Sequence, residues 1–371
     1  MTGCKPERQE WVDMAKGIAI IAVVMGHIGF CWPHSRFLPL NVLLIWLWHV
    51  PVFFMIGGFF LDDKKLVHPV AFIKRKLKTL YLPLLYVYVP VLLLHNVFIS
   101  AGVYDVGTNY SGHHVSWWGA TDYVVQGIKS LLLVGQEPLL GAMWFVFVLF
   151  WAQTLLSVSS NLLRKTGRQW EQNTFDLVRF LVLLCLAVLS WSLTAMGYTK
   201  MLFSVTLVAA WLIYVGMLLM RRLRPQFDNG IVALICVVIA WHASCSVGGV
   251  NLVDNRFHDV ITLTVSALAC LYVVCYVAKL IECRSKMLTA VLTPIGRDSF
   301  YIMGLHFAGF KICTVALDQL GWDIPLAELV PPVGHCVGQF FCYVLFGAGF
   351  PLILTAVLRR LKAAVGHRTV R

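Results

Sequence analysis

The first apolar segment reads Asp13-Met-Ala-Lys16-Gly17-Ile-Ala-Ile-Ile-Ala-Val-Val-Met-Gly26-His27, with a lysine near its start and a histidine at its end. Ionisable side chains inside a membrane span are costly, so a histidine there is by default a candidate functional residue. The eleven residues from Lys16 to His27 make almost three helical turns, which puts both side chains on one face, about 16 Å apart. We therefore expect a cation at the membrane surface and a titratable imidazole deeper in the bilayer.

Apolar composition extends this pattern along the whole chain. Of the 371 residues, 59% are hydrophobic and 13% are charged, whereas soluble domains average about half apolar and a quarter charged. Apolar runs of about 20 residues, each long enough to cross a bilayer, recur from one end to the other. We predict an all-α polytopic membrane protein with about ten transmembrane helices. The predicted spans are Lys16–Cys31, Leu40–Leu61, Thr79–Ser100, Leu139–Leu162, Phe175–Ala195, Met201–Met220, Gly230–Cys245, Asp259–Ile281, Ser299–Leu317 and Gly334–Leu358.

Lysine and arginine are distributed unevenly between the segments that connect these spans. Counting Lys16, 24 of the 30 basic residues lie before the first span or after the second, fourth, sixth, eighth and tenth. The positive-inside rule then places both termini in the cytoplasm. Topology mainly explains the net charge of +12, so nucleic-acid binding is not expected.

The chain is predicted to form one membrane domain, residues 1–371, with a core at about 8–358 and a basic cytoplasmic tail at 359–371. No small-residue cleavage site follows the first apolar run, so we expect that span to be retained rather than removed as a signal peptide. The eleven cysteines show no CxxC or other metal-type spacing, and we expect neither a bound metal nor a disulfide framework. The absence of Walker, HExxH and GxSxG motifs argues against a nucleotide-hydrolysing pump or a zinc enzyme.

Asp13, Lys16 and His27 form the first candidate site. An imidazole titrates near neutral pH, so His27 could act as a general base that takes the proton of an acceptor hydroxyl as its oxygen attacks a thioester. Lys16 and Asp13 would position an anionic donor, or each other, at the cytoplasmic mouth. In the structural alternative, Lys16 snorkels to the interface and His27 hydrogen-bonds to another helix. The shared face of Lys16 and His27 favours the functional interpretation.

Two further stretches carry polar groups that a span does not need. His49 precedes Pro51 within the second span and could join a polar cavity, or it could lie near the interface on a kinked helix. The basic run 74–78 places Arg75 and Lys78 three residues apart on one helix face. These two side chains could clamp phosphates, or they could anchor the loop to anionic lipid. The residues alone leave both pairs of alternatives open.

The ninth span supplies the last candidates. His306 lies about two helical turns into it and Ser299 stands at its start, so we expect both to contribute polar groups to a substrate site, although His306 could also be structural. Trp144 opens the fourth span, where tryptophan is most often an interfacial residue. Arg179 and Lys311 are intramembrane cations to which the sequence assigns no role.

Together these motifs resemble the acyltransferase-3 family of integral membrane acyltransferases, especially its fucose 4-O-acetylase-like branch. The opening family motif, with its Lys/Arg-x10-His spacing, is matched by Arg8, Asp13, Lys16, Gly17, Gly26 and His27. The next motif, Phe-His-x-Pro-x-Phe-Phe, is matched by Trp48-His49-Val-Pro51-Val-Phe53-Phe54. The weaker elements are Arg75-x-x-Lys78, in which a lysine replaces the family's second arginine, Trp144-Phe145, and the closing Ile295-Gly296 to Ser299 and His306.

The resemblance implies an acyl-CoA donor, typically acetyl-CoA, as a co-substrate from the cytoplasm, with no bound cofactor. It implies an acceptor sugar hydroxyl on a lipid-linked or envelope polysaccharide, and a protein in the bacterial inner membrane. The CoA phosphates would lie among Lys16, Arg75 and Lys78, and the thioester would reach His27. Asp13, His49, Trp144, Ser299 and His306 would complete the binding residues. The choice between direct transfer and an acyl-histidine stays open, as do the acyl group, the sugar and the oligomeric state.

A function from another class is compatible with the same residues. His27, His49 and His306 could form the relay of a proton-coupled transporter or flippase of an envelope precursor. Neither an inverted repeat nor a matched pair of broken helices stands out in the sequence, which argues against this alternative. A non-catalytic scaffold in a polysaccharide export complex is a third possibility.

Overall fold

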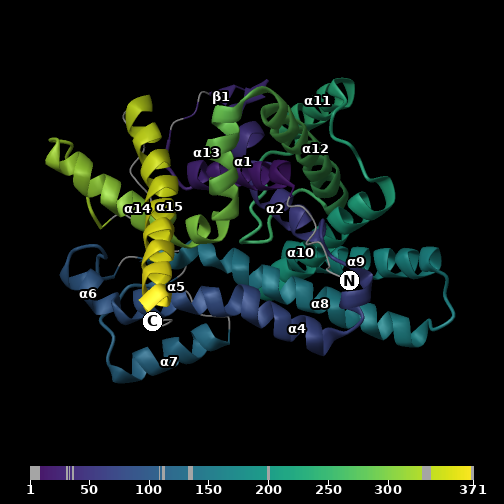
Figure 1. Cartoon of the computed structure of the whole chain (residues 1–371), viewed down its shortest axis with the longest axis horizontal. Coiled ribbons are helices and arrows are strands. Elements are labelled where there is room, and N and C mark those ends of the chain that lie inside the picture. Colours follow the sequence, from purple (N-terminus) through teal and green to yellow (C-terminus); the bar gives the residue numbers. More distant parts are fainter. Residues whose placement is uncertain are drawn as a thin grey trace.

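A computed structural model describes residues 9–368 apart from 31, 33, 36, 108, 111–112, 133–136, 199–200 and 328–335; the motif residue Arg8 lies outside this part. The described chain is almost entirely helical, which confirms the all-α class (Figure 1). Its strands form two short antiparallel hairpins, in which β1 (His34–Ser35) pairs with β2 (Leu38–Pro39) and β3 (Asn109–Tyr110) pairs with β4 (His113–His114).

The helices follow one another through the whole described chain. In the first half they are α1 (Glu10–Gly26), η1 (Val42–Trp46), α2 (His49–Gly58), α3 (Asp63–Leu66), α4 (Pro69–Lys76), η2 (Leu77–Tyr81), α5 (Leu82–Leu93), α6 (His95–Ser100), α7 (Ala120–Leu131), η3 (Pro138–Met143) and α8 (Trp144–Thr166). In the second half they are α9 (Gln172–Ala195), α10 (Met201–Leu218), η4 (Leu219–Leu223), α11 (Gly230–Ser246), α12 (Val260–Arg284), α13 (Lys286–Arg297), α14 (Ser299–Gln319) and α15 (Val337–Arg368).

Seven helical stretches of the described chain are long and apolar enough to cross a bilayer. These stretches are Pro69–Leu93, Pro138–Thr166, Gln172–Ala195, Leu202–Leu223, Val260–Arg284, Ser299–Gln319 and Val337–Ala364. The other three predicted spans also correspond to helices, but these are shorter: α1 has 17 residues, and the two remaining stretches are Val42–Gly58 and Gly230–Ser246. The protein is therefore a multi-pass membrane protein, and the count of ten spans stays a prediction.

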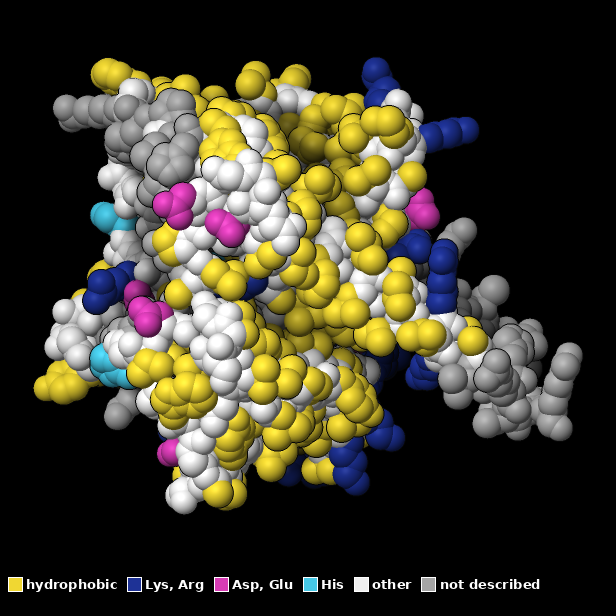
Figure 2. Space-filling model, turned by 90° about the vertical axis from the view of Figure 1, so that its left-hand side faces the viewer, with side chains coloured by type: hydrophobic (Ala, Val, Ile, Leu, Met, Phe, Trp, Pro, Cys, Tyr) yellow, Lys and Arg dark blue, Asp and Glu magenta, His cyan; other side chains and the backbone are white. Residues whose placement is uncertain are grey.

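The start of α1 and the later turns of α15 both contact residues at the junction of α13 and α14. Arg297 is 3.7 Å from Glu10 at the start of α1, and its neighbour Asp298 pairs with Arg359 near the end of α15. Figure 2 shows most of the visible Lys and Arg side chains along its right-hand side, most Asp, Glu and His side chains along its left, and hydrophobic side chains between. This charge separation is the kind that the positive-inside rule describes, and which side is cytoplasmic stays a prediction.

Close backbone contacts fix α1 at the centre of the bundle, where it packs against α2, α12, α13, α14 and α15. A Cβ atom added to Gly296 of α13 would lie 1.6 Å from the Asp13 carbonyl oxygen, and one added to Gly17 would lie 2.5 Å from the Leu292 carbonyl oxygen. Small residues at a helix crossing allow backbones to approach this closely within a membrane. The glycine of the Lys16-Gly17 pair and the glycine of the closing motif therefore meet at one helix crossing.

Candidate active site

His27 caps the end of α1, and its ring is held by a hydrogen bond to the backbone of that helix. Its Nδ1 lies 2.8 Å from the Val23 carbonyl oxygen. A carbonyl can only accept a hydrogen bond, so Nδ1 carries the proton and Nε2 of the neutral ring keeps a free lone pair. The site of proton uptake on His27 is therefore Nε2, at the end of α1 opposite Lys16.

A cavity of about 150 Å³ lies next to His27. Its walls come from α1, η1, α2, η3, α8, α14 and the loop between α11 and α12. The lining residues are Val23, His27, Trp46, His49, Val50, Ala142, Trp144, Phe145, Val250, Asn251, Leu252, Val253 and Met303. Three predicted site residues, His27, His49 and Trp144, thus line one cavity, although Trp144 lies more than ninety residues after the two histidines in the chain.

His49 lines the cavity as a buried side chain. Its Nδ1 lies 2.8 Å from the Ile45 carbonyl oxygen, so its Nε2 is also the unprotonated nitrogen of the neutral ring. The ring meets Trp46 edge-on, with 5.4 Å between ring centroids. Because η1 is a π-helical stretch, which is often found at functional sites, the backbone turns before α2 in a way that a regular helix would not. The sequence left open whether His49 joins a cavity or lies near the membrane interface. Its position among the lining residues supports the first interpretation.

His306 contacts His27 but is not among the residues that line the cavity. The two imidazole centroids are 4.9 Å apart, and Phe307 packs against both rings. His306 is fully buried, and its Nδ1 lies 2.9 Å from the Ile302 carbonyl oxygen. Within the described residues its Nε2 has no hydrogen-bond partner. His306 is thus placed to act on His27 rather than on a molecule in the cavity.

Lys16 and Asp13 lie at the opposite end of α1 in a small ionic group. The Lys16 ammonium is 3.7 Å from the Asp13 carboxylate, and Arg297 is 3.5 Å from the same carboxylate. Asp13 is almost fully buried, whereas Lys16 is half-buried. Ser299 begins α14 beside this group and does not reach the cavity. The helix therefore carries a cation near its start and is followed directly by an imidazole at its end, while their shared face stays a prediction.

Arg75 and Lys78 are exposed and lie outside the cavity. Arg75 belongs to the last turn of α4 and Lys78 to the following π-helical stretch η2, so the helix geometry changes between them. The α4 helix packs against α8. The two cations therefore remain accessible to an anion, as either of their sequence interpretations requires.

Comparison with known protein families bears on this arrangement. The model of a family described as an acyltransferase domain, acyltransferase-3, matches residues 9–360. The chain belongs to the acyltransferase-3 family. The same comparisons find no match among curated proteins or solved structures. The protein is accordingly a membrane acyltransferase.

Sequence reasoning about this acyltransferase missed the loop that joins α11 to α12. The backbone N–H of Val250 donates to the Trp46 carbonyl oxygen at 2.8 Å, and Val250 to Val253 line the cavity. Asn251 is the polar side chain of this group. Polar residues are common in loops that connect membrane spans, so the sequence of this loop did not mark it as part of the site. Only its tertiary contact with η1 shows that it lies there.

Arg179, to which the sequence assigned no role, belongs to a buried ion-pair network. Its guanidinium lies 2.8 Å from the Asp63 carboxylate and 3.2 Å from the Asp176 carboxylate. Arg221 pairs with both of these carboxylates, and Arg222 pairs with Asp176. The network ties α3, at the start of the basic segment 63–78, to α9 and η4. Lys311 is also held, since its ammonium donates to the carbonyl oxygens of Val103 and Leu326.

A second polar cluster that the sequence did not predict lies just before η3. His95 Nδ1 is 3.1 Å from Glu137, while its Nε2 is 3.0 Å from the Ser116 carbonyl oxygen. The Tyr104 hydroxyl donates to Glu137 at 2.6 Å. Glu137 immediately precedes η3, which leads to the cavity residues Ala142 and Trp144. The cluster therefore fixes the start of one cavity wall.

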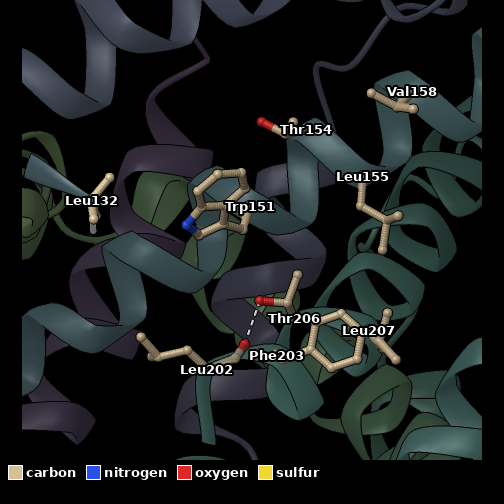
Figure 3. Close-up of a pocket in the computed structure, with 9 residues that line it drawn as sticks. All are labelled: Leu132, Trp151, Thr154, Leu155, Val158, Leu202, Phe203, Thr206 and Leu207. Atoms are coloured by element: carbon tan, nitrogen blue, oxygen red, sulfur yellow. Dashed lines mark hydrogen bonds between the residues drawn. The ribbon is translucent and has the colours of Figure 1, made fainter. Parts of the chain in front are cut away.

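A separate groove of about 430 Å³ lies between the end of α7, α8 and the first turns of α10 (Figure 3). Its lining residues are Leu132, Trp151, Thr154, Leu155, Val158, Leu202, Phe203, Thr206 and Leu207. The Thr206 hydroxyl is used within its own helix, since it donates to the Leu202 carbonyl oxygen at 2.6 Å. Among the described residues that line this groove, none is titratable. The smaller cavity at His27 is the better candidate for the reaction.

Proposed function

We propose that this acyltransferase is an O-acetyltransferase that moves acetyl from acetyl-CoA to a sugar hydroxyl of a cell-envelope polysaccharide or glycolipid. Its place would be the bacterial inner membrane, and its relatives the fucose 4-O-acetylase-like branch of the family. One observation carries the proposal: His27 presents a free Nε2 beside a cavity, at the far end of a helix whose first turns hold Lys16.

The donor would extend along α1 from its cationic end. The phosphates of CoA would lie near Lys16, with Arg75 and Lys78 as further cationic partners, and Asp13 would orient Lys16. About 16 Å separates Lys16 from His27 at helical rise, a distance comparable to an extended pantetheine arm. Trp144 and His49 would border the thioester in the cavity.

In the transfer step, Nε2 of His27 takes the proton of the acceptor hydroxyl. The hydroxyl oxygen forms a bond to the thioester carbonyl carbon, the carbon–sulfur bond breaks, and the proton passes from Nε2 to the CoA sulfur. The hydrogen bond from Nδ1 to Val23 stabilises the imidazolium that forms in between. If donor and acceptor approach from opposite ends, His27 Nε2 instead attacks the thioester carbonyl carbon, the carbon–sulfur bond breaks and CoA leaves as a thiolate. The acceptor hydroxyl then takes the acetyl group from Nε2, and its proton is released to solvent, from which the CoA thiolate is protonated.

The test is acetyl transfer from labelled acetyl-CoA to envelope glycan in membranes that contain the protein. A general base contributes about 10²–10⁴-fold to a rate, so His27→Ala should lower transfer by that factor. His242→Ala is the matched control, because His242 is an exposed histidine of α11, and it should leave transfer within about twofold of the wild type. Full activity of the His27→Ala variant would refute the role of His27.

A proton-coupled transporter is the second candidate function. It is favoured by the contact between His27 and His306 and by the position of His49 in the same cavity, since intramembrane histidines that lie close together can relay protons. Flux of a glycolipid precursor into sealed vesicles without acyl-CoA would support this candidate. Strict dependence of all activity on acyl-CoA would exclude it.

A further inference from the structure

The loop between α11 and α12 is held rigidly over the cavity by contacts at several points. Val250 is bound to the Trp46 carbonyl oxygen, and Asn251 and Arg256 exchange backbone hydrogen bonds of 2.9 and 2.8 Å. The fully buried Asn255 adopts a left-handed conformation (φ 54°), and its amide donates to Ser190 and Thr194 of α9. These bonds hold the part of the loop that meets the cavity in place before any ligand binds.

Asn251 is a neutral polar residue among those that line the cavity, whose other lining residues are His27, His49 and mainly apolar or aromatic residues. Its amide nitrogen donates to the Asp254 carboxylate at 2.9 Å, and its amide oxygen faces the Asp254 backbone N–H at 3.4 Å. An amide has two N–H donors and two acceptor lone pairs, so one donor and one lone pair remain for a ligand. Asn251 and the indoles of Trp46 and Trp144 line the same cavity as His27.

This combination matches the chemistry of a carbohydrate. A sugar ring has C–H faces that pack on indoles, and its hydroxyls both donate and accept hydrogen bonds, as the Asn251 amide does. A pocket with apolar walls and a few placed polar groups obtains its specificity from those polar groups. His27 addresses a single hydroxyl, so a second polar contact is needed to fix which one.

We propose that Asn251 hydrogen-bonds a second acceptor hydroxyl, next to the one that His27 deprotonates, and so makes the cavity selective for vicinal diols of carbohydrates. The inference rests on the proposed acyl transfer to a sugar and adds to it a residue that would orient the acceptor and select its hydroxyl. Asp254 orients the Asn251 amide and does not itself line the cavity.

The test uses the full-length protein in nanodiscs with labelled acetyl-CoA and soluble methyl glycopyranosides as acceptor probes. Each glycoside is compared with the deoxy analogue that lacks the neighbouring hydroxyl. One neutral hydrogen bond accounts for about a tenfold difference, so the wild type should show a KM about tenfold lower for the glycoside. Asn251→Leu should raise the glycoside KM about tenfold and remove the preference, with kcat and the KM for acetyl-CoA unchanged.

Val253→Ala is the matched control, because Val253 lines the same cavity without a polar group, and it should keep the preference for the glycoside. Asn251→Ala provides the same comparison if the leucine variant does not fold. An unchanged preference in either Asn251 variant overturns the assignment. If the wild type turns over acetyl-CoA in a His27-dependent way but acylates no glycoside, the role of Asn251 is refuted while acyl transfer stands. If the wild type neither turns over acetyl-CoA in a His27-dependent way nor acylates a glycoside, the proposed function itself is refuted.

Discussion

Replacing Gly296 by alanine should force α13 away from α1. The new Cβ would lie 1.6 Å from the carbonyl oxygen of Asp13 and 2.9 Å from the backbone nitrogen of Gly17. A relaxed carbon–oxygen contact is about 3.4 Å, so the two backbones must separate by roughly 2 Å. Both obstructing atoms belong to the backbone of a helix, and no side chain can rotate to relieve the contact. Overpacking of this kind costs about 1–3 kcal/mol, and we expect the upper end of that range.

Thermal unfolding of the purified protein in detergent, at a fixed scan rate, measures this cost. The apparent Tm of Gly296→Ala should fall by roughly 3–6 °C. Gly127→Ala is the matched control, because Gly127 lies within helix α7 and a Cβ there meets no other atom within 4 Å. That variant should unfold at or slightly above the wild-type temperature, since alanine favours helix over glycine. Equal Tm values for Gly296→Ala and Gly127→Ala would refute the close crossing of α1 and α13.

Two further perturbations test features away from the cavity. Arg179→Ala removes one partner of the Asp176 carboxylate, which keeps Arg221 and Arg222, and should destabilise the protein by about 1–3 kcal/mol in chemical unfolding, whereas the exposed Arg168→Ala should cost less than about 0.5 kcal/mol. At the start of α12, burial tends to raise the pKa of Asp259, but hydrogen bonds from Thr262 and neighbouring groups lower it to about 2. Because this pKa is depressed in the folded state, the stability that Asp259 contributes is complete above pH 4 and is lost as the pH falls toward 2. Thermal unfolding between about pH 2 and 5 should therefore lose part of its pH dependence in Asp259→Asn, and an identical profile in both proteins would contradict this.

Local periodicity was enough to predict a helix over the first apolar run, which the structure has from Glu10 to Gly26. His27 directly follows this helix, and the common face of Lys16 and His27 stays a prediction. The all-α class follows equally from the apolar runs. The lengths of the spans were harder to predict, because hydropathy does not show where a π-helical stretch or a turn interrupts an apolar run. Such an interruption occurs around residues 42–48.

Contacts between distant segments could not be predicted in the same way. One partner of Arg179, Asp176, lies three residues earlier in the same span, but the other, Asp63, comes from α3 and could not be identified from the sequence. Asn251 lies at the cavity only because the loop after α11 is bound to η1 through Trp46. His306 was expected at the substrate site from its depth in the ninth span, yet depth alone did not reveal that it contacts His27 without lining the cavity.

His27, His49 and His306 share one feature: in each, Nδ1 forms a hydrogen bond to the backbone carbonyl oxygen four residues earlier in the chain. Each ring therefore receives its tautomer from its own backbone and needs no neighbouring helix to select it. Cavity walls can consequently be exchanged by substitution, or shift during a catalytic cycle, without resetting which nitrogen is basic. In evolutionary terms, the chemistry of the base is separable from the recognition of the acceptor, so a new sugar specificity can arise by changing the walls alone.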